Sequence, residues 1–142
     1  MMTNWDTFLE PAIDELFVRT FVGWVEGSGY RKIQVKKHPR WPGGRMEAML
    51  ERYEEVGRGL SAEEMAANLE AGTIISTGST ALVSLKLIRS DLNCIDYGSD
   101  FYCEHAFHGD NSVKTLLSAS GITLVQMAAP QPERWEQIET EL

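Results

Sequence analysis

The sequence predicts a single α+β domain with N-terminal helices, a mostly antiparallel sheet of four to six strands and a C-terminal helix. Three observations support this. The chain of 142 residues is long enough for one domain and too short for two ordinary ones. Apolar residues recur every three to four positions before residue 72, whereas the pattern has a period of about two afterwards. Glycines separate the alternating runs, as expected for tight turns. We therefore treat residues 1–142 as one domain.

The first half of the chain predicts two helices around a short strand. Residues 5–24 have apolar side chains at helical spacing, and Pro11 fits a first helical turn. Residues 30–37 alternate, which predicts a short strand near a sheet edge. Residues 38–44 hold two prolines and two glycines and predict a loop. A second helix is expected over residues 46–56.

The clearest local signal lies at Ser61. Ser61 and Glu64 have the spacing of a capping box, and Leu60 and Met65 occupy the positions of a hydrophobic staple. We expect a helix to begin there and to end near residue 71, with Gly72 as its left-handed cap.

The second half of the chain predicts the sheet. Two glycine–serine pairs, at Gly78 and at Gly98, suit two-residue hairpin turns between strands. A helix is expected over residues 112–119, capped by Asp110 or Asn111, and an amphipathic helix over residues 132–142. The strands are expected at residues 74–77, 80–89, 92–97, 101–107 and 122–127.

Composition excludes several classes of protein. The net charge of −8 disfavours general nucleic-acid binding, which needs cations to replace phosphate counterions. No apolar run approaches the ~20 residues that cross a bilayer, so we predict no membrane association. The N-terminus lacks the basic flank and apolar core of a secretory signal, and a cytoplasmic location is therefore expected.

The charge is unevenly distributed along the chain. Residues 27–46, here called the basic segment, contain six basic residues and no acid, while the flanking regions are acidic. One interpretation is a solvated strand and loop whose cations balance acidic neighbours. The functional interpretation is a contact with a partner or an anion. Trp41 could be an anchor for a partner, because Trp and Arg are enriched at binding hot spots. A buried core position for Trp41 is the alternative. The predicted binding residues are Arg31, Lys36, Lys37, Arg40 and Trp41.

Both cysteines and two of the three histidines lie within residues 94–108. A hairpin at Gly98 would place Cys94 opposite Cys103, with Asp96 and His105 on the same face. Four interpretations stay open: two buried apolar thiols, a cross-strand disulfide, a zinc site that includes His105 and His108, or a cysteine nucleophile activated by His105. The first is favoured, so we predict no metal, no cofactor and no catalytic residue.

The remaining motifs are weaker. Residues 76–80 hold four hydroxyl side chains around a glycine, but the expected strands on both sides favour an ordinary hairpin turn over a phosphate cradle. Sequence patterns typical of dinucleotide, zinc-protease, hydrolase and calcium sites are absent from the chain.

The sequence therefore favours a non-catalytic acidic binding protein of inhibitor, immunity or adaptor type that acts through a protein partner. The partner would bind to the basic segment or to an acidic face of a helix. One alternative is a small enzyme or zinc-binding domain that uses the cysteines and His105. Another is a binder of a small anionic ligand reached by Arg31, Lys36 and Arg40. The acidic face would consist of Glu47, Glu51, Glu54, Glu55, Glu63 and Glu64.

Overall fold

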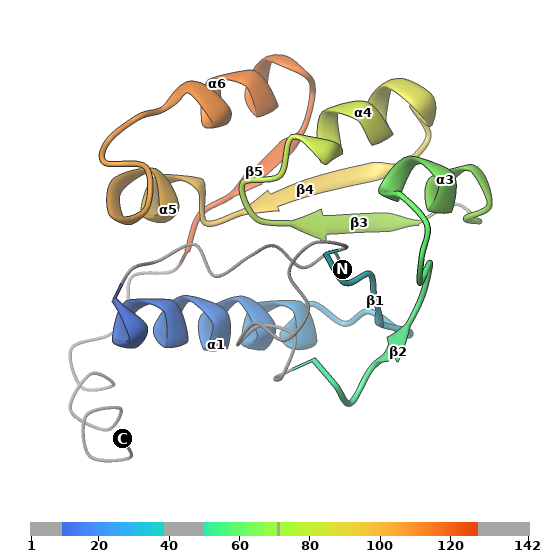
Figure 1. Ribbon diagram of the computed structural model, residues 1–142, viewed down its shortest axis with the longest axis horizontal. Coiled ribbons are helices and arrows are strands. Elements are labelled where there is room, and N and C mark those ends of the chain that lie inside the picture. The colour runs from blue at the N-terminus through green and yellow to red at the C-terminus, as the bar shows by residue number, and fades with distance from the viewer. Residues whose placement is uncertain (1–9, 39–49, 71, 128–142) are drawn as a thin grey trace.

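The computed structural model describes residues 10–38, 50–70 and 72–127. No helix within these ranges is long and apolar enough to cross a membrane. In chain order (Figure 1), the elements are α1 (Pro11–Gly27), β1 (Gln34–Val35), β2 (Glu54–Glu55), α3 (Ala62–Ala67), β3 (Thr73–Ser76), α4 (Ala81–Ile88), β4 (Asn93–Tyr97), α5 (Ser99–His105), α6 (Ser112–Ala119) and β5 (Thr123–Val125).

The main sheet is parallel. Its three strands lie in the order β3-β4-β5, with Ile75 opposite Ile95 and Ile95 opposite Thr123. A second sheet pairs β1 with β2, also in parallel. The prediction of a mostly antiparallel sheet of four to six strands is therefore wrong: the described residues form two parallel sheets of three and two strands.

Two segments with the alternating pattern of strands are helical instead. Residues 80–89 contain α4 and residues 101–107 contain most of α5. Gly78 and Gly98 do adopt positive φ angles, as expected, but each ends a strand just before a helix. Parallel neighbours need such a crossover, because a two-residue turn can join only antiparallel strands.

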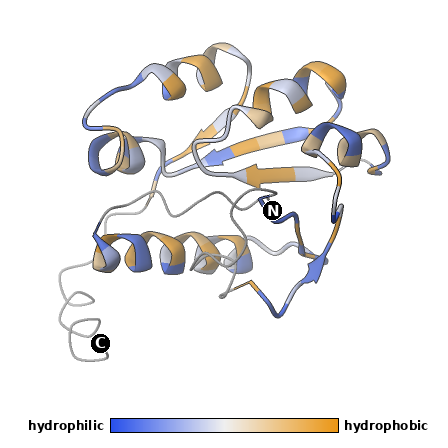
Figure 2. Ribbon diagram, viewed as in Figure 1, coloured by the Kyte–Doolittle hydropathy of each residue, from blue (hydrophilic) through white to orange (hydrophobic). Residues whose placement is uncertain are grey.

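Helices cover both faces of the main sheet. Figure 1 shows α4 and α6 above it and α1 below it. Side chains of a strand alternate between the two faces, so Ile74 and Cys94 contact the α4–α6 layer while Ile75 and Ile95 contact α1. Figure 2 shows the apolar residues gathered along these inner surfaces. Both crossovers use the same face, as right-handed connections between consecutive strands require.

Helix α1 confirms a helix within the predicted range of residues 5–24 and extends it to Gly27. Residues 5–9 lie outside the described residues. Pro11 occupies the first helical position, where its missing N–H leaves no hydrogen bond unmade. Phe17 contacts the loop after β4 so closely that a Cβ at Gly98 would lie 2.5 Å from its ring. Only glycine fits at that point.

The capping box at the start of α3 is confirmed. The Glu64 N–H donates to the Ser61 hydroxyl, and the Ser61 N–H donates to the Glu64 carboxylate. The helix ends at Ala67, earlier than expected, and Gly72 does not adopt a positive φ. The Arg89 guanidinium donates to the carbonyls of Ala66 and Leu69, in the last turn of the helix and just beyond it.

Other predictions had mixed outcomes. The helix at Ser112–Ala119 is confirmed as α6, and the last strand as β5, which is shorter than expected. The predicted strand at residues 30–37 shrinks to β1. The helix expected over residues 46–56 is wrong where it is described, since β2 lies there and the Val56 N–H donates to the Val35 carbonyl. Glu54 and Glu55 therefore do not belong to an acidic helical face. Residues 46–49 and 132–142 lie outside the described residues.

Candidate functional site

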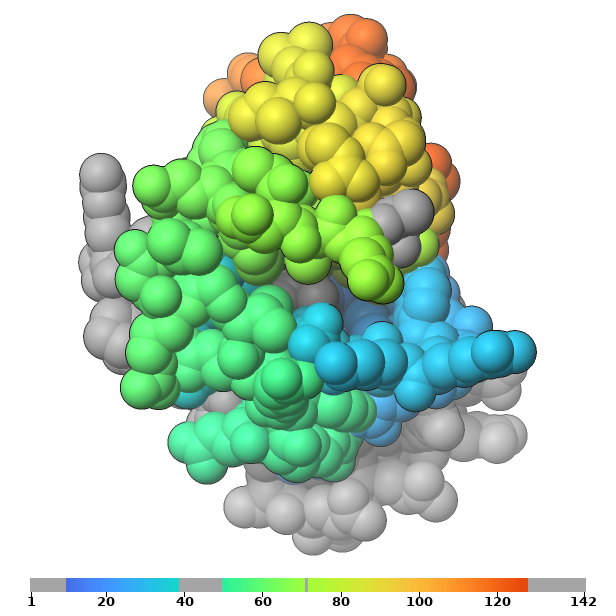
Figure 3. Space-filling model, turned by 90° about the vertical axis from the view of Figure 1, so that its right-hand side faces the viewer, coloured from blue at the N-terminus to red at the C-terminus, as the bar shows by residue number. Residues whose placement is uncertain are grey.

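A cavity of about 730 Å³ opens beside the amino ends of β3 and β4. It lies between residues 30–36, which lead into β1, and the segment that runs through α3 into β3. Figure 3 looks at this end of the molecule and shows the hollow between the cyan chain of residues 30–36 and the green chain of α3 and β3. A volume of this size is ordinary for a small-molecule site.

Apolar side chains form part of the cavity wall, and polar or charged side chains form the rest. Buried residues from α1, from β3 and from the position just before β4 form its inner part, and α3 supplies one side. The apolar residues that line it, apart from Tyr30, are Val25, Ile33, Val56, Met65, Leu69, Ile74, Ile75 and Leu92.

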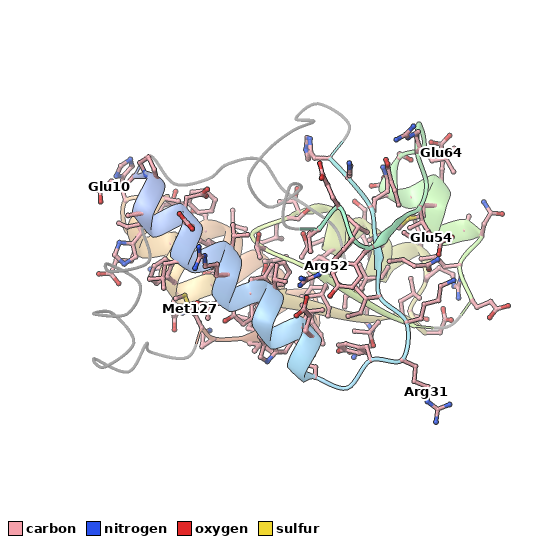
Figure 4. All side chains as sticks on the ribbon, turned by 90° about the horizontal axis from the view of Figure 1, so that it is seen from below. Glu10, Arg31, Arg52, Glu54, Glu64 and Met127 are labelled. Carbon is pink, nitrogen blue, oxygen red and sulfur yellow. The ribbon has the colours of Figure 1, made fainter. Side chains whose placement is uncertain are left out.

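Three basic residues line the same cavity, and all three belong to the basic segment. Lys36 is 6% exposed, and its ammonium donates to the Lys37 carbonyl at 3.1 Å. Arg31 and Lys32 are exposed at the mouth. Figure 4 shows the Arg31 side chain extending away from the chain. The deepest cation of the set is therefore Lys36.

Acidic residues of β2 balance part of this charge. Lys32 forms an ion pair with Glu54 at 3.3 Å, and Gln34 donates to the same carboxylate at 2.7 Å. The Gln34 hydrogen bond, followed by Lys32, lowers the pKa of Glu54. The hydrogen bond from Arg58 lowers the pKa of Glu55, with smaller contributions from the nearby charges of Lys37 and Lys36. The cavity mouth is thus electrostatically mixed, although cations outnumber acids along its lining.

The structure brings together only part of the predicted binding set. Arg31 and Lys36 line the cavity, while Lys37 is half-buried next to Lys36. Arg40 and Trp41 lie outside the described residues. Sequence reasoning missed the apolar walls, because residues such as Leu69 and Ile74 look like ordinary core positions until α3 and β3 are placed in space. The one feature of the sequence that pointed to this cavity was the absence of acidic residues from the basic segment.

The opposite edge of the main sheet is closed by hydrogen bonds. Asp96, near the end of β4, is 0% exposed. One of its carboxylate oxygens accepts from the Gly78 N–H at 2.7 Å, and the other accepts from the Tyr102 hydroxyl at 2.8 Å. Asp96 therefore joins the turn after β3 to α5. Residues 76–80, predicted as a hairpin turn, are a strand-to-helix turn.

Burial changes the acidity of this pair. It raises the pKa of Asp96 to about 6, against the opposing effects of the Tyr102 and Gly78 hydrogen bonds. Burial also raises the pKa of Tyr102, and the Asp96 charge adds to that shift. A neutral phenol donating to a buried carboxylate is the arrangement expected near neutral pH.

A second set of bonds ties β5 to the same edge. The Gln126 amide donates to the buried Ser99 hydroxyl at 2.9 Å, and its oxygen accepts from the Asp100 N–H at 3.0 Å. The start of α5 is thus held from two sides, by Asp96 and by Gln126.

The cysteines do not form a site. Cys94 lies opposite Ile74 in the sheet, and Cys103 lies in α5, so the predicted cross-strand opposition is wrong because the second strand of the supposed hairpin is a helix. Their burial is confirmed, and it raises the pKa of both thiols. The His105 ring lies tilted against the Phe101 ring, with ring centroids 4.3 Å apart. Within the described ranges, no group of three or more His, Cys, Asp or Glu residues could hold a metal ion.

Comparison with known proteins adds no assignment. No protein-family model, no curated protein and no solved structure matches this chain. Any functional conclusion has to come from the chemistry of the cavity.

Proposed function

We propose that this protein is a non-catalytic binding protein that holds a small anionic ligand in the cavity at the amino ends of β3 and β4. One observation carries the proposal: the cationic residues Arg31, Lys32 and Lys36 line the same space as a set of aliphatic side chains. Small-molecule sites commonly combine apolar walls with a few polar groups that fix orientation.

Lys36 is the residue expected to bind the anion directly. A buried ammonium needs hydrogen-bonding or charged partners, and an anionic ligand would join those that Lys36 already has, the Lys37 carbonyl among them. Arg31 and Lys32 at the mouth would attract an anion into a protein whose overall charge is −8.

A thermal-shift panel tests the proposal. Acetate, phosphate, benzoate and octanoate would be added at matched ionic strength, and a bound anion should raise the unfolding midpoint by mass action. Lys36→Met keeps an unbranched apolar stem and should abolish the shift. Lys114→Met, which removes a lysine of α6 outside the cavity lining, should retain it. If none of the four anions raises the midpoint of the unmodified protein, the proposal is wrong.

Action through a protein partner stays a prediction. Two of the residues assigned to that contact, Arg40 and Trp41, lie outside the described residues, and Lys36 is too buried to form part of a flat contact surface. A cytoplasmic location likewise stays a prediction.

A further inference from the structure

Within the part of the chain that the structure describes, β3 pairs with another strand on one side alone. The order β3-β4-β5 puts β3 at the end of the sheet, with β4 along one of its sides. The Asn93 N–H donates to the Gly72 carbonyl, so the parallel register turns the backbone groups of Gly72 and Ile74 toward β4. The backbone groups of Thr73 and Ile75 therefore point the other way, along what we call the outer side of β3.

The outer side of β3 borders the cavity. Thr73, which is half-buried, and Ile75, which is buried, both line it, and residues 30–36 form the facing wall. No hydrogen bond among the described residues uses the backbone N–H or C=O of Thr73 or Ile75. Unpaired backbone groups at the end of a sheet are a template for a further strand, and buried ones are rarely left without partners. Each of the two residues thus has one donor and one acceptor available on this side.

This pairing of donors with acceptors indicates the chemistry of the ligand. A small anion accepts hydrogen bonds, so it would leave the carbonyl groups of Thr73 and Ile75 unpaired. An extended peptide has N–H and C=O groups that alternate as those of a strand do, and it can bond to both kinds of group. Such main-chain bonds depend on the backbone of β3 and not on apolar side chains of the cavity wall.

The side chains at the cavity mouth add a preference of charge. Arg31 and Lys32 are exposed on one wall, and Glu70 is exposed on the other (Figure 3). Lys32 is paired with Glu54 and Lys36 has partners of its own, whereas Arg31 forms no ion pair with a described residue. The free cation of this set is therefore Arg31, and an acidic side chain is complementary to it.

We infer, on the condition that the proposed function holds, that the cavity binds an extended acidic segment of a partner protein. The segment adds as a strand to the outer side of β3 and places a carboxylate at Arg31, and that carboxylate is the anion of the proposed function. A second copy of this chain is a poorer occupant, because pairing two β3 strands would bring the cations of both mouths together.

Isothermal titration calorimetry with capped peptides tests this inference on the full chain. The probe is a pentapeptide in which glutamate and valine alternate, with glutamate at both ends. It should bind at least about tenfold more tightly than a capped single glutamate, because strand pairing adds several hydrogen bonds. N-methylation of two consecutive central amides removes a donor from each side of the peptide and should weaken binding about tenfold. Lysine in place of glutamate should also weaken binding about tenfold, because like charges then face each other.

Two pairs of variants locate the peptide. Thr73→Pro removes an outward N–H at the first residue of β3, where proline leaves the bonds to β4 intact, and should weaken the acidic peptide about fivefold. Thr73→Val keeps that N–H and should bind the peptide as the unmodified chain does. Arg31→Gln should weaken binding about threefold. Arg19→Gln, at an exposed position of α1 outside the lining, should leave it unchanged.

Circular dichroism would establish that each variant is folded. The N-methylated peptide needs no variant, so it keeps the test decisive if the proline variant does not fold.

The outcomes separate the added strand from the anion site. If acetate, phosphate, benzoate or octanoate raises the unfolding midpoint but the acidic peptide does not bind, the added strand is wrong and the proposed function stands. An N-methylated peptide or a single glutamate that binds as tightly as the acidic peptide would have the same meaning. A lysine peptide that binds equally well would overturn the acidic partner, and no binding by any anion or peptide would overturn both proposals. Size-exclusion chromatography that shows a dimer, unchanged by the acidic peptide, would assign the outer side of β3 to a second copy and overturn the inference.

Discussion

The two edges of the three-stranded sheet are built in opposite ways. At the carboxyl edge, Asp96 and Ser99 are fully buried and bonded to groups from neighbouring elements. At the amino edge, Lys36 lies in the wall of an open cavity and donates to the Lys37 carbonyl, among its other contacts. Open parallel sheets usually bind ligands at the carboxyl edge. In this chain, side chains of the protein itself fill the carboxyl edge of the sheet, and the cavity lies at the amino edge.

Polar groups at the carboxyl edge are fully buried and bond elements of the fold to one another, whereas those at the amino edge line a cavity that is open to solvent. A buried network with every member bonded stabilises and rigidifies its surroundings, and losing one member leaves others unsatisfied. A cation in a partly apolar cavity adds little to stability and gains most when a ligand arrives. Changes at the carboxyl edge should therefore alter stability, and changes at the amino edge should alter binding.

The largest expected effect is on stability at the carboxyl edge. Asp96→Ala removes the acceptor of the half-buried Gly78 N–H and of the buried Tyr102 hydroxyl. We expect a loss of about 4 kcal/mol in the free energy of unfolding, measured by urea denaturation. Glu104→Ala, at an exposed position of α5, should change it by less than about 0.5 kcal/mol. A loss below about 1 kcal/mol at Asp96 would show that this edge is not the stabilising one.

The same carboxylate should make stability depend on pH. Its pKa is about 6 in the folded chain and near 3.8 when exposed, so between these values the folded state holds a proton that the unfolded state has released. The free energy of unfolding should therefore fall as pH rises from about 4 to 6, by up to about 3 kcal/mol in total, and level off above about 7. Asp96→Asn keeps an acceptor for the Gly78 N–H and cannot titrate. Urea denaturation from pH 4 to pH 7 should show the fall in the unmodified chain and not in this variant; parallel curves would refute the assignment.

A smaller effect is expected at the helix that forms one wall of the cavity. Ser61→Ala removes the hydroxyl that accepts from the Glu64 N–H and should cost about 1 kcal/mol. Because Met65 and Leu69 follow on the same segment, the change should also weaken octanoate binding slightly. Ser118→Ala, on an exposed face of α6, is the matched control and should leave both quantities unchanged. Equal denaturation midpoints for the Ser61 variant and the unmodified chain would mean that the cap does not stabilise α3.

Helices and caps could be predicted from the sequence where they depend on neighbouring residues and not on tertiary contacts. The capping box at Ser61 and the helix Ser112–Ala119 depend on neighbouring residues alone, and both are confirmed. Residues 81–88 could not be assigned in the same way, because a short apolar run is compatible with a strand or a buried helix. The burial of Leu82 and Leu85, three positions apart and both 0% exposed, shows the helical period only once the sheet beneath them is known.

The candidate site was only partly predictable for a related reason. The absence of acids from the basic segment pointed to Arg31 and Lys36, which do line the cavity. The wall residues Met65 and Leu69 come from a different part of the chain, and only the parallel topology brings them opposite residues 30–36. Non-local pairing of this kind leaves no periodic trace in the sequence.

Backbone-amide NMR of the full chain, titrated with octanoate, tests the central claim most directly, because it reports both edges of the sheet in one experiment. Chemical-shift changes are expected at residues 30–36, 65–69 and 73–75, which contain residues of the cavity lining, with residues 76–80 and 96–102 unchanged. Changes concentrated at residues 76–80 and 96–102 would place the binding site at the carboxyl edge and contradict the account, as would a spectrum that octanoate leaves unchanged throughout.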